Sequence, residues 1–107
     1  MARDIGPFQF EILETLQAQP RDAYGLTIRD RIKQRSGHEP SIGAIYTALE
    51  RLERQGFVSS WWGEPTEERG GRRKRLYKIE APGELTARRF AARYSGFGAT
   101  AAAAAWG

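Results

Sequence analysis

The stretch PSIGAIYTALERLERQGFV, from Pro40 to Val58, decides the fold of this chain. Ser41 is a good helix N-cap, because its hydroxyl can accept a hydrogen bond from an unpaired amide in the first turn. Three apolar residues recur at i, i+4 and i+7 and so share one helical face: Ile45, Leu49 and Leu52. Gly56 suits the left-handed position at which many helices end. The stretch therefore predicts a capped amphipathic helix, and the strand formers after Gly56 predict a strand.

The face opposite these apolar residues carries small, polar and basic residues. Gly43 and Ala44 let a backbone approach a surface closely, and hydroxyl groups or amides at the helix start can donate to phosphate. The candidate DNA-contacting residues of this helix are Ser41, Gly43, Ala44, Tyr46, Thr47, Arg51 and Arg54. Two alternatives stay open. Tyr46 can be a half-buried core residue, and the arginines can pair with carboxylates, as Glu50 and Arg54 do in the favourable i, i+4 order.

A glycine-rich basic segment, GGRRKRLYKI, runs from Gly70 to Ile79. Its two glycines permit a tight approach to a surface, and arginine recognises phosphate through two parallel hydrogen bonds. A short basic loop is often merely solvated, and the carboxylates within residues 64–68 can pair with these arginines. Its place on a hairpin directly after the capped helix favours a phosphate-contacting turn instead. The predicted contacts are Gly71, Arg72, Arg73 and Lys74.

The remaining pattern predicts a single, mainly α domain with a small β-hairpin. We expect helices over about 7–19, 22–36 and 41–55, strands over about 57–63 and 74–80, and a fourth helix from about residue 82. Asp22 is the expected cap of the second helix, and Gly25 in its first turn suggests a close helix crossing. This order is the outline of a winged helix-turn-helix with an added C-terminal helix. In that architecture the third helix enters the DNA major groove and the wing lies on phosphates. We expect a DNA-binding unit over 1–82 and a dimerisation helix over 83–107, within one globular unit.

Aromatic residues suggest a second surface. Trp61 and Trp62 are adjacent on a predicted strand, so we expect one in the core and the other exposed. The last helix carries more apolar surface than a terminal helix should leave in water, which predicts a homodimer. The expected interface residues are Leu85, Phe90, Tyr94, Phe97 and Trp106. Trp106 or the outward tryptophan can stack on an aromatic small-molecule effector, and the alternative is that Trp106 anchors the last helix.

Composition narrows the class of protein. The chain has 107 residues, 40% of them hydrophobic, which suits one globular domain. The net charge is +4, and a lone histidine with no cysteine makes a metal site, a disulfide framework or a cysteine nucleophile poor hypotheses. We expect no cofactor and no enzymatic activity. We see neither a signal peptide nor an apolar run of about 20 residues that would span a membrane, so the cytoplasm is the default location.

Four segments together resemble the PadR family of winged-helix transcriptional regulators: GPFQFEILETL, DAYG, SIGAIYTALERLERQGFV and GGRRKRLYKI. The resemblance covers about residues 6–83. It implies a dimeric repressor that binds double-stranded operator DNA through the third helix and the wing, with the C-terminal helix forming the dimer. Some small members also bind flat aromatic drugs between the subunits, using tryptophan. The chain departs from the family after Leu85, where no further leucine occurs.

A winged-helix protein-interaction module that does not bind DNA is the alternative function. Such modules tend to lose the basic wing, whereas this chain has one. The wing is therefore the feature that favours DNA binding.

Overall fold

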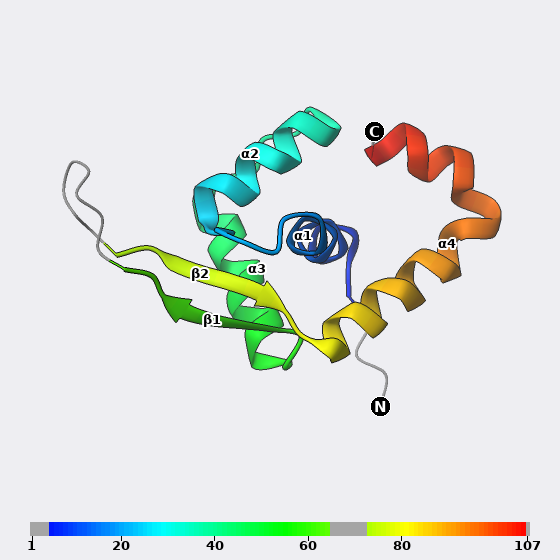
Figure 1. The fold of residues 1–107 in the computed structure, drawn as a ribbon. Coiled ribbons are helices and arrows are strands. Elements are labelled where there is room, and N and C mark those ends of the chain that lie inside the picture. The colour runs from blue at the N-terminus through cyan, green and yellow to red at the C-terminus, as the bar shows by residue number, and fades with distance from the viewer. Residues whose placement is uncertain (1–4, 65–72, 107) are drawn as a thin grey trace.

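The computed structural model describes residues 5–64 and 73–106, with side chains as far as Tyr94. The elements follow the order α1 (Pro7–Ala18), α2 (Gly25–Ser36), α3 (Ile42–Arg54), β1 (Val58–Trp62), β2 (Arg75–Ile79) and α4 (Ala81–Trp106) (Figure 1). The predicted fold class, mainly α with one small hairpin, is confirmed. Helix α1 lies at the centre and contacts α2, α3, α4 and β2.

The core is built from the apolar faces of the first three helices. Side chains with almost no exposed surface come from α1 (Ile12, Leu13, Leu16), α2 (Ile28, Ile32) and α3 (Ile45, Leu49, Leu52). Each such side chain stabilises the fold by about 1.5–3 kcal/mol relative to its exposed state. Because the predicted apolar face of α3 lies inward, its polar and basic face is left toward solvent.

Both predicted ends of α3 are confirmed. The hydroxyl of Ser41 accepts a hydrogen bond from the backbone N–H of Ala44 at 3.0 Å. At the other end, Gly56 has a φ of 82°. The N–H of Gly56 donates to the carbonyl of Glu53 at 3.0 Å, and the N–H of Phe57 donates to that of Leu52 at 2.9 Å. These two bonds form a Schellman motif, which ends the helix and sends the chain into β1.

The predicted start of α2 is wrong. Asp22 adopts a φ of 59° and does not cap the helix, which begins at Gly25 with Tyr24 as its N-cap. The cause is tertiary: the carbonyl of Ala23 accepts a hydrogen bond from the N–H of Tyr77 in β2, at 2.9 Å. The expected close crossing at Gly25 is confirmed, because a Cβ there would lie 2.7 Å from the ring of Tyr46 on α3.

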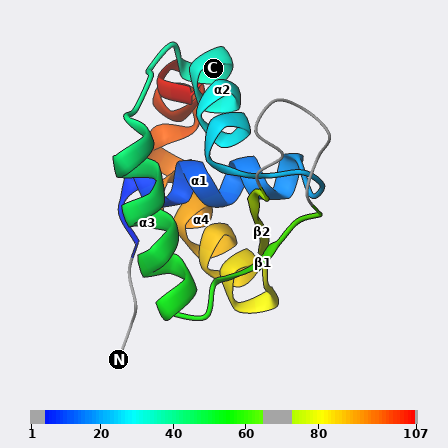
Figure 2. The ribbon, with the colours of Figure 1, turned by 90° about the vertical axis from the view of Figure 1, so that its left-hand side faces the viewer.

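The hairpin is antiparallel and pairs Val58 with Ile79 at its base and Trp62 with Arg75 toward its turn. Helix α3 lies beside the hairpin, and α1 crosses both α3 and β2 (Figures 1 and 2). The expectation that one tryptophan enters the core is wrong, since Trp61 and Trp62 are 41% and 55% exposed. The core takes Phe57, Val58 and Tyr77 from the base of the ribbon instead.

Helix α4 begins at Ala81, directly after β2. Its first turn lies so close to the end of α3 that a Cβ on Gly83 would be 2.2 Å from the carbonyl oxygen of Phe57. Further along, Phe90 stacks on Phe10 of α1 with ring centroids 4.5 Å apart. These contacts join α4 to the same core as the other helices.

Candidate nucleic-acid interface

The outward face of α3 is a continuous exposed strip. Ser41 lies at its start, and the exposed residues of the helix itself are Gly43, Thr47, Glu50, Arg51 and Arg54. Nothing but the Ser41 hydroxyl, at 4.0 Å, stands near the position of a Gly43 Cβ, so the backbone is open to a close partner there. The strip therefore begins at a glycine that a partner can approach closely and ends at two arginines.

The two arginines of this strip have no partner in the described part of the chain. The expected pair between Glu50 and Arg54 is not formed, since the ion pairs of residues 5–64 and 73–94 involve other side chains. Glu53, which neighbours both arginines in sequence, accepts a hydrogen bond from the hydroxyl of Ser60 at 2.7 Å. Both guanidinium groups, of Arg51 and Arg54, are consequently available to an anionic partner.

Two candidate residues of α3 are only half-exposed. Ala44 lies partly beneath the strip, and Tyr46 packs against the core with its ring beside Gly25. Tyr46 also lines a cavity of about 450 Å³ between α3 and the hairpin, together with Trp62 and Arg75. The half-buried alternative for Tyr46 is therefore the correct description of its packing.

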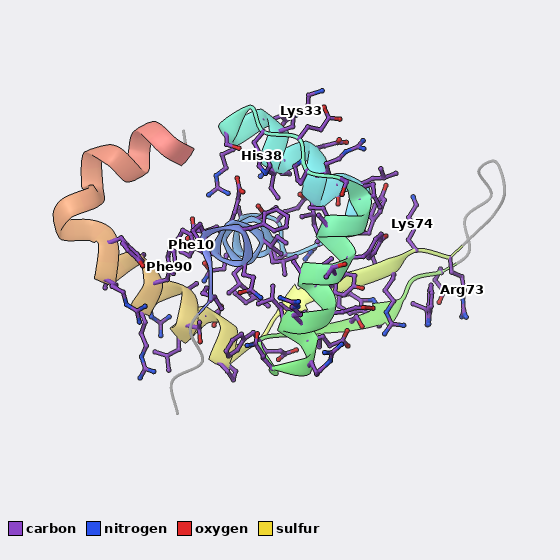
Figure 3. The ribbon with its side chains drawn as sticks, turned by 180° about the vertical axis from the view of Figure 1, so that it is seen from behind. Phe10, Lys33, His38, Arg73, Lys74 and Phe90 are labelled. Carbon is purple, nitrogen blue, oxygen red and sulfur yellow. The ribbon has the colours of Figure 1, made fainter. Side chains whose placement is uncertain are left out.

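The described start of the wing is held by two cation–π contacts. The Lys74 ammonium lies 4.7 Å from the centroid of the Tyr24 ring, and the Arg75 guanidinium lies 5.0 Å from that of Trp62. Arg73 is exposed, and it lies at the end of the hairpin beside Lys74 (Figure 3). Gly71 and Arg72 are outside the described residues. The Lys74 contact joins the hairpin to the N-cap of α2, whereas the Arg75 contact lies within the hairpin itself.

Sequence reasoning missed Tyr24, Trp62 and Arg75 as supports of the wing. The pairing of Trp62 with Arg75 follows from the strand register, so a two-strand alignment of the hairpin would have found it. The contact between Lys74 and Tyr24 joins residues far apart in the chain, so no local sequence pattern predicts it. Lys33, exposed at the end of α2 and paired with Glu39 at 3.3 Å, is a further basic group that the sequence did not single out.

The predicted dimer residues differ in how much of their surface is exposed. Leu85 and Tyr94 are 40% and 39% exposed, so both leave apolar surface in contact with solvent. Phe90 is half-buried between Phe10 and Tyr94, so part of its surface is already used within the subunit. The side chains of Phe97 and Trp106 are outside the described residues.

Other kinds of site find no support in the described part of the chain. Residues 5–64 and 73–94 hold no group of three side chains suited to binding a metal ion. The helices searched within the described residues include none that is both long and apolar enough to cross a bilayer.

Three helices, the exposed strip on the third and the basic hairpin beside it define a winged helix-turn-helix protein. The sequence profile of the transcriptional regulator PadR-like family matches residues 12–89. The chain belongs to this family, whose members are transcriptional regulators and not enzymes. A sequence comparison with curated proteins gives no significant match.

Solved structures share the fold. A PadR family transcription regulator from Clostridium difficile R20291 aligns with a TM-score of 0.70 and 23% identity, covering 86% of this chain and 91% of that one. A transcriptional regulator from Clostridium thermocellum has a TM-score of 0.70 and 24% identity over 83% of this chain and 81% of that one. Bacillus subtilis PadR, solved in complex with operator DNA, has a TM-score of 0.64 and 19% identity over 78% of this chain and 46% of that one.

Proposed function

We propose that this protein is a cytoplasmic, sequence-specific repressor that binds double-stranded operator DNA as a homodimer. The observation that carries the proposal is the exposed strip of α3, with two unpaired arginines, beside a basic wing. A PadR protein of the same fold has been solved on operator DNA, which supports this reading.

In this proposal α3 lies in the major groove. Gly43 allows close approach, and Thr47 and Arg51 contact base edges, where a good bidentate contact discriminates by about 1–3 kcal/mol. The amides at the start of α3 and the Ser41 hydroxyl stand near the backbone of the DNA. Arg54, at the far end of the strip, contacts a phosphate.

The wing supplies contacts that do not depend on sequence. Arg72, Arg73 and Lys74 neutralise phosphates in this proposal, and Gly71 next to them lets the wing approach the DNA backbone closely. The cation–π contact of Lys74 with Tyr24 ties the hairpin to the helical body, which supports a wing that reaches the same duplex as α3. Each phosphate contact is expected to add about 0.9 to the salt slope of binding.

The dimer places two copies of α3 on half-sites about one helical turn apart. Leu85 and Tyr94 are the most exposed of the described residues that we assign to this interface, and their exposure leaves apolar surface to be covered. Phe90, Phe97 and Trp106 complete the proposed interface. An aromatic effector near Trp106 or the exposed Trp61 and Trp62 is a further element of this proposal.

The alternative, a protein-interaction module, is favoured by one observation, the exposure of both tryptophans on the hairpin.

One experiment separates the two functions. Binding sites are selected from random duplex DNA with the wild type, and affinity for the selected site is compared for Arg51→Ala and Lys78→Ala. Each variant removes one charge, but Lys78 lies on β2 away from the α3 strip and pairs with Glu80. We expect a loss of about 1–3 kcal/mol for Arg51→Ala and little change for Lys78→Ala. Failure to select any site, or equal losses for both variants, would contradict the proposal.

A further inference from the structure

A second cavity, of about 580 Å³, lies on the other side of α3 from the hairpin pocket, between the start of α1, the end of α2 and the start of α3. Its apolar wall includes Phe8, Pro40 and Ala44, and its polar groups come from Glu11, Ser36 and His38. His38 marks the end of α2 in Figure 3. The volume is in the range of small-molecule sites, which combine apolar walls with a few polar groups.

Glu11 is the unusual member of this lining. It is only 3% exposed, and no other charged side chain in the described part of the chain is as deeply buried. The Ser36 hydroxyl donates to its Oε2 at 3.1 Å. Among residues 5–64 and 73–94 no ion pair reaches Glu11, because the nearby Arg35 binds Glu14 instead, at 3.1 Å.

The buried carboxylate of Glu11 is in an environment that favours binding of a cation. Burial raises the pKa of its carboxyl above 4.5, and the Ser36 hydrogen bond, His38 and Arg35 offset this only in part. A buried carboxylate without a paired charge is costly, and a bound cation with a hydrogen-bond donor relieves that cost.

We propose that this cavity binds a small amphiphilic amine, with its ammonium group on the Glu11 carboxylate and its apolar part against Phe8 and Pro40. The apolar wall and the single carboxylate suit one ring and one amino group. The Phe8 and His38 rings already form an edge-to-face pair, with centroids 6.1 Å apart, so an aromatic ligand extends an existing cluster. An acid of the same shape would place its charge against Glu11 and be excluded.

The site touches the base of the proposed recognition helix. Pro40 immediately precedes the Ser41 cap, and Ala44 lies in the first turn of α3. A ligand held there is expected to change DNA affinity, and DNA must change ligand affinity by the same factor. This regulatory part rests on the proposed function, whereas the binding site itself does not.

The binding test uses the full chain without DNA. Calorimetric titration with 2-phenylethylamine is compared with 2-phenylethanol and phenylacetate, which have the same ring and spacer but are neutral and anionic. We expect saturable binding of the amine alone, weakened at least about tenfold by Glu11→Gln through loss of a charge-assisted hydrogen bond. Glu84→Gln is the control, since Glu84 carries the same charge but lies on α4 and does not line the cavity. It should leave amine binding unchanged.

A second measurement keeps the test decisive if Glu11→Gln does not fold. Amide resonances of the wild type are followed during the amine titration, and shifts at His38 and Ala44, with none at Arg73, support the site. Absence of saturable binding, equal binding of the three probes, or shifts confined to other regions would overturn it. A band-shift assay with and without the amine tests the coupling. Unchanged affinity for DNA would overturn the regulatory part, and lack of any DNA binding would count against the proposed function alone.

Discussion

Gly83→Ala is the most direct test of how α4 joins the winged helix. The new Cβ would lie 2.2 Å from the carbonyl oxygen of Phe57 and 2.9 Å from Cγ1 of Ile79. That carbonyl cannot simply turn away, because it accepts a hydrogen bond from the N–H of Glu80 at 2.9 Å. Helix α4 must therefore retreat, which disturbs the stacking of Phe90 on Phe10.

Two effects of opposite sign set the change in the free energy of unfolding. Overpacking costs about 1–3 kcal/mol, while alanine in place of glycine in a helix gains about 0.5–1 kcal/mol. We therefore expect a net loss of about 1–2 kcal/mol in the free energy of unfolding, or a fall in Tm of at least about 4 °C. Urea unfolding followed by circular dichroism, at one fixed protein concentration, measures it.

Gly43→Ala is the matched control for stability. Gly43 also lies in the first turn of a helix, but a Cβ there meets only the Ser41 hydroxyl, at 4.0 Å. Alanine should therefore leave stability unchanged or raise it by up to about 1 kcal/mol. If Gly83→Ala is as stable as the wild type or more stable, the close approach of α4 to Phe57 is wrong.

Three further predictions concern the helix cap, the buried carboxylate and the dimer. Ser41→Ala should cost about 1 kcal/mol of unfolding free energy in urea titrations, because the first turn of α3 loses the acceptor of its Ala44 amide; a cost near zero would contradict the cap. Since burial raises the folded-state pKa of Glu11, its contribution to stability is fully present below 4.5 and is lost as the pH rises through the raised value. Thermal unfolding from pH 4 upward should show this loss in the wild type but not in Glu11→Gln, and parallel curves would argue against it. The double variant Leu85→Glu, Tyr94→Glu should sediment as a monomer and bind DNA much more weakly than the wild type, and a wild type that is monomeric at micromolar concentration would defeat the proposed dimer.

The sequence by itself determined α3, its two ends and the hairpin that follows. The Ser41 cap and the Gly56 turn depend on hydrogen bonds between residues a few positions apart, so local chemistry is enough to predict them. The exposed strip of the candidate site followed in the same way, because an inward apolar face leaves the opposite face in solvent. The fold class and the family follow from the order of these local units.

Only the tertiary structure decided where distant segments meet. Helix α2 starts after Asp22, the predicted cap, because Tyr77 engages the carbonyl of Ala23. Both hairpin tryptophans, not one, remain exposed because the core takes its hairpin side chains from the base of the ribbon, which strand alternation cannot reveal. The burial of Glu11 is likewise set by packing between helices far apart in the chain. The energy of such contacts depends on which surfaces pack together, and a periodic pattern shows that a face is apolar without showing what covers it.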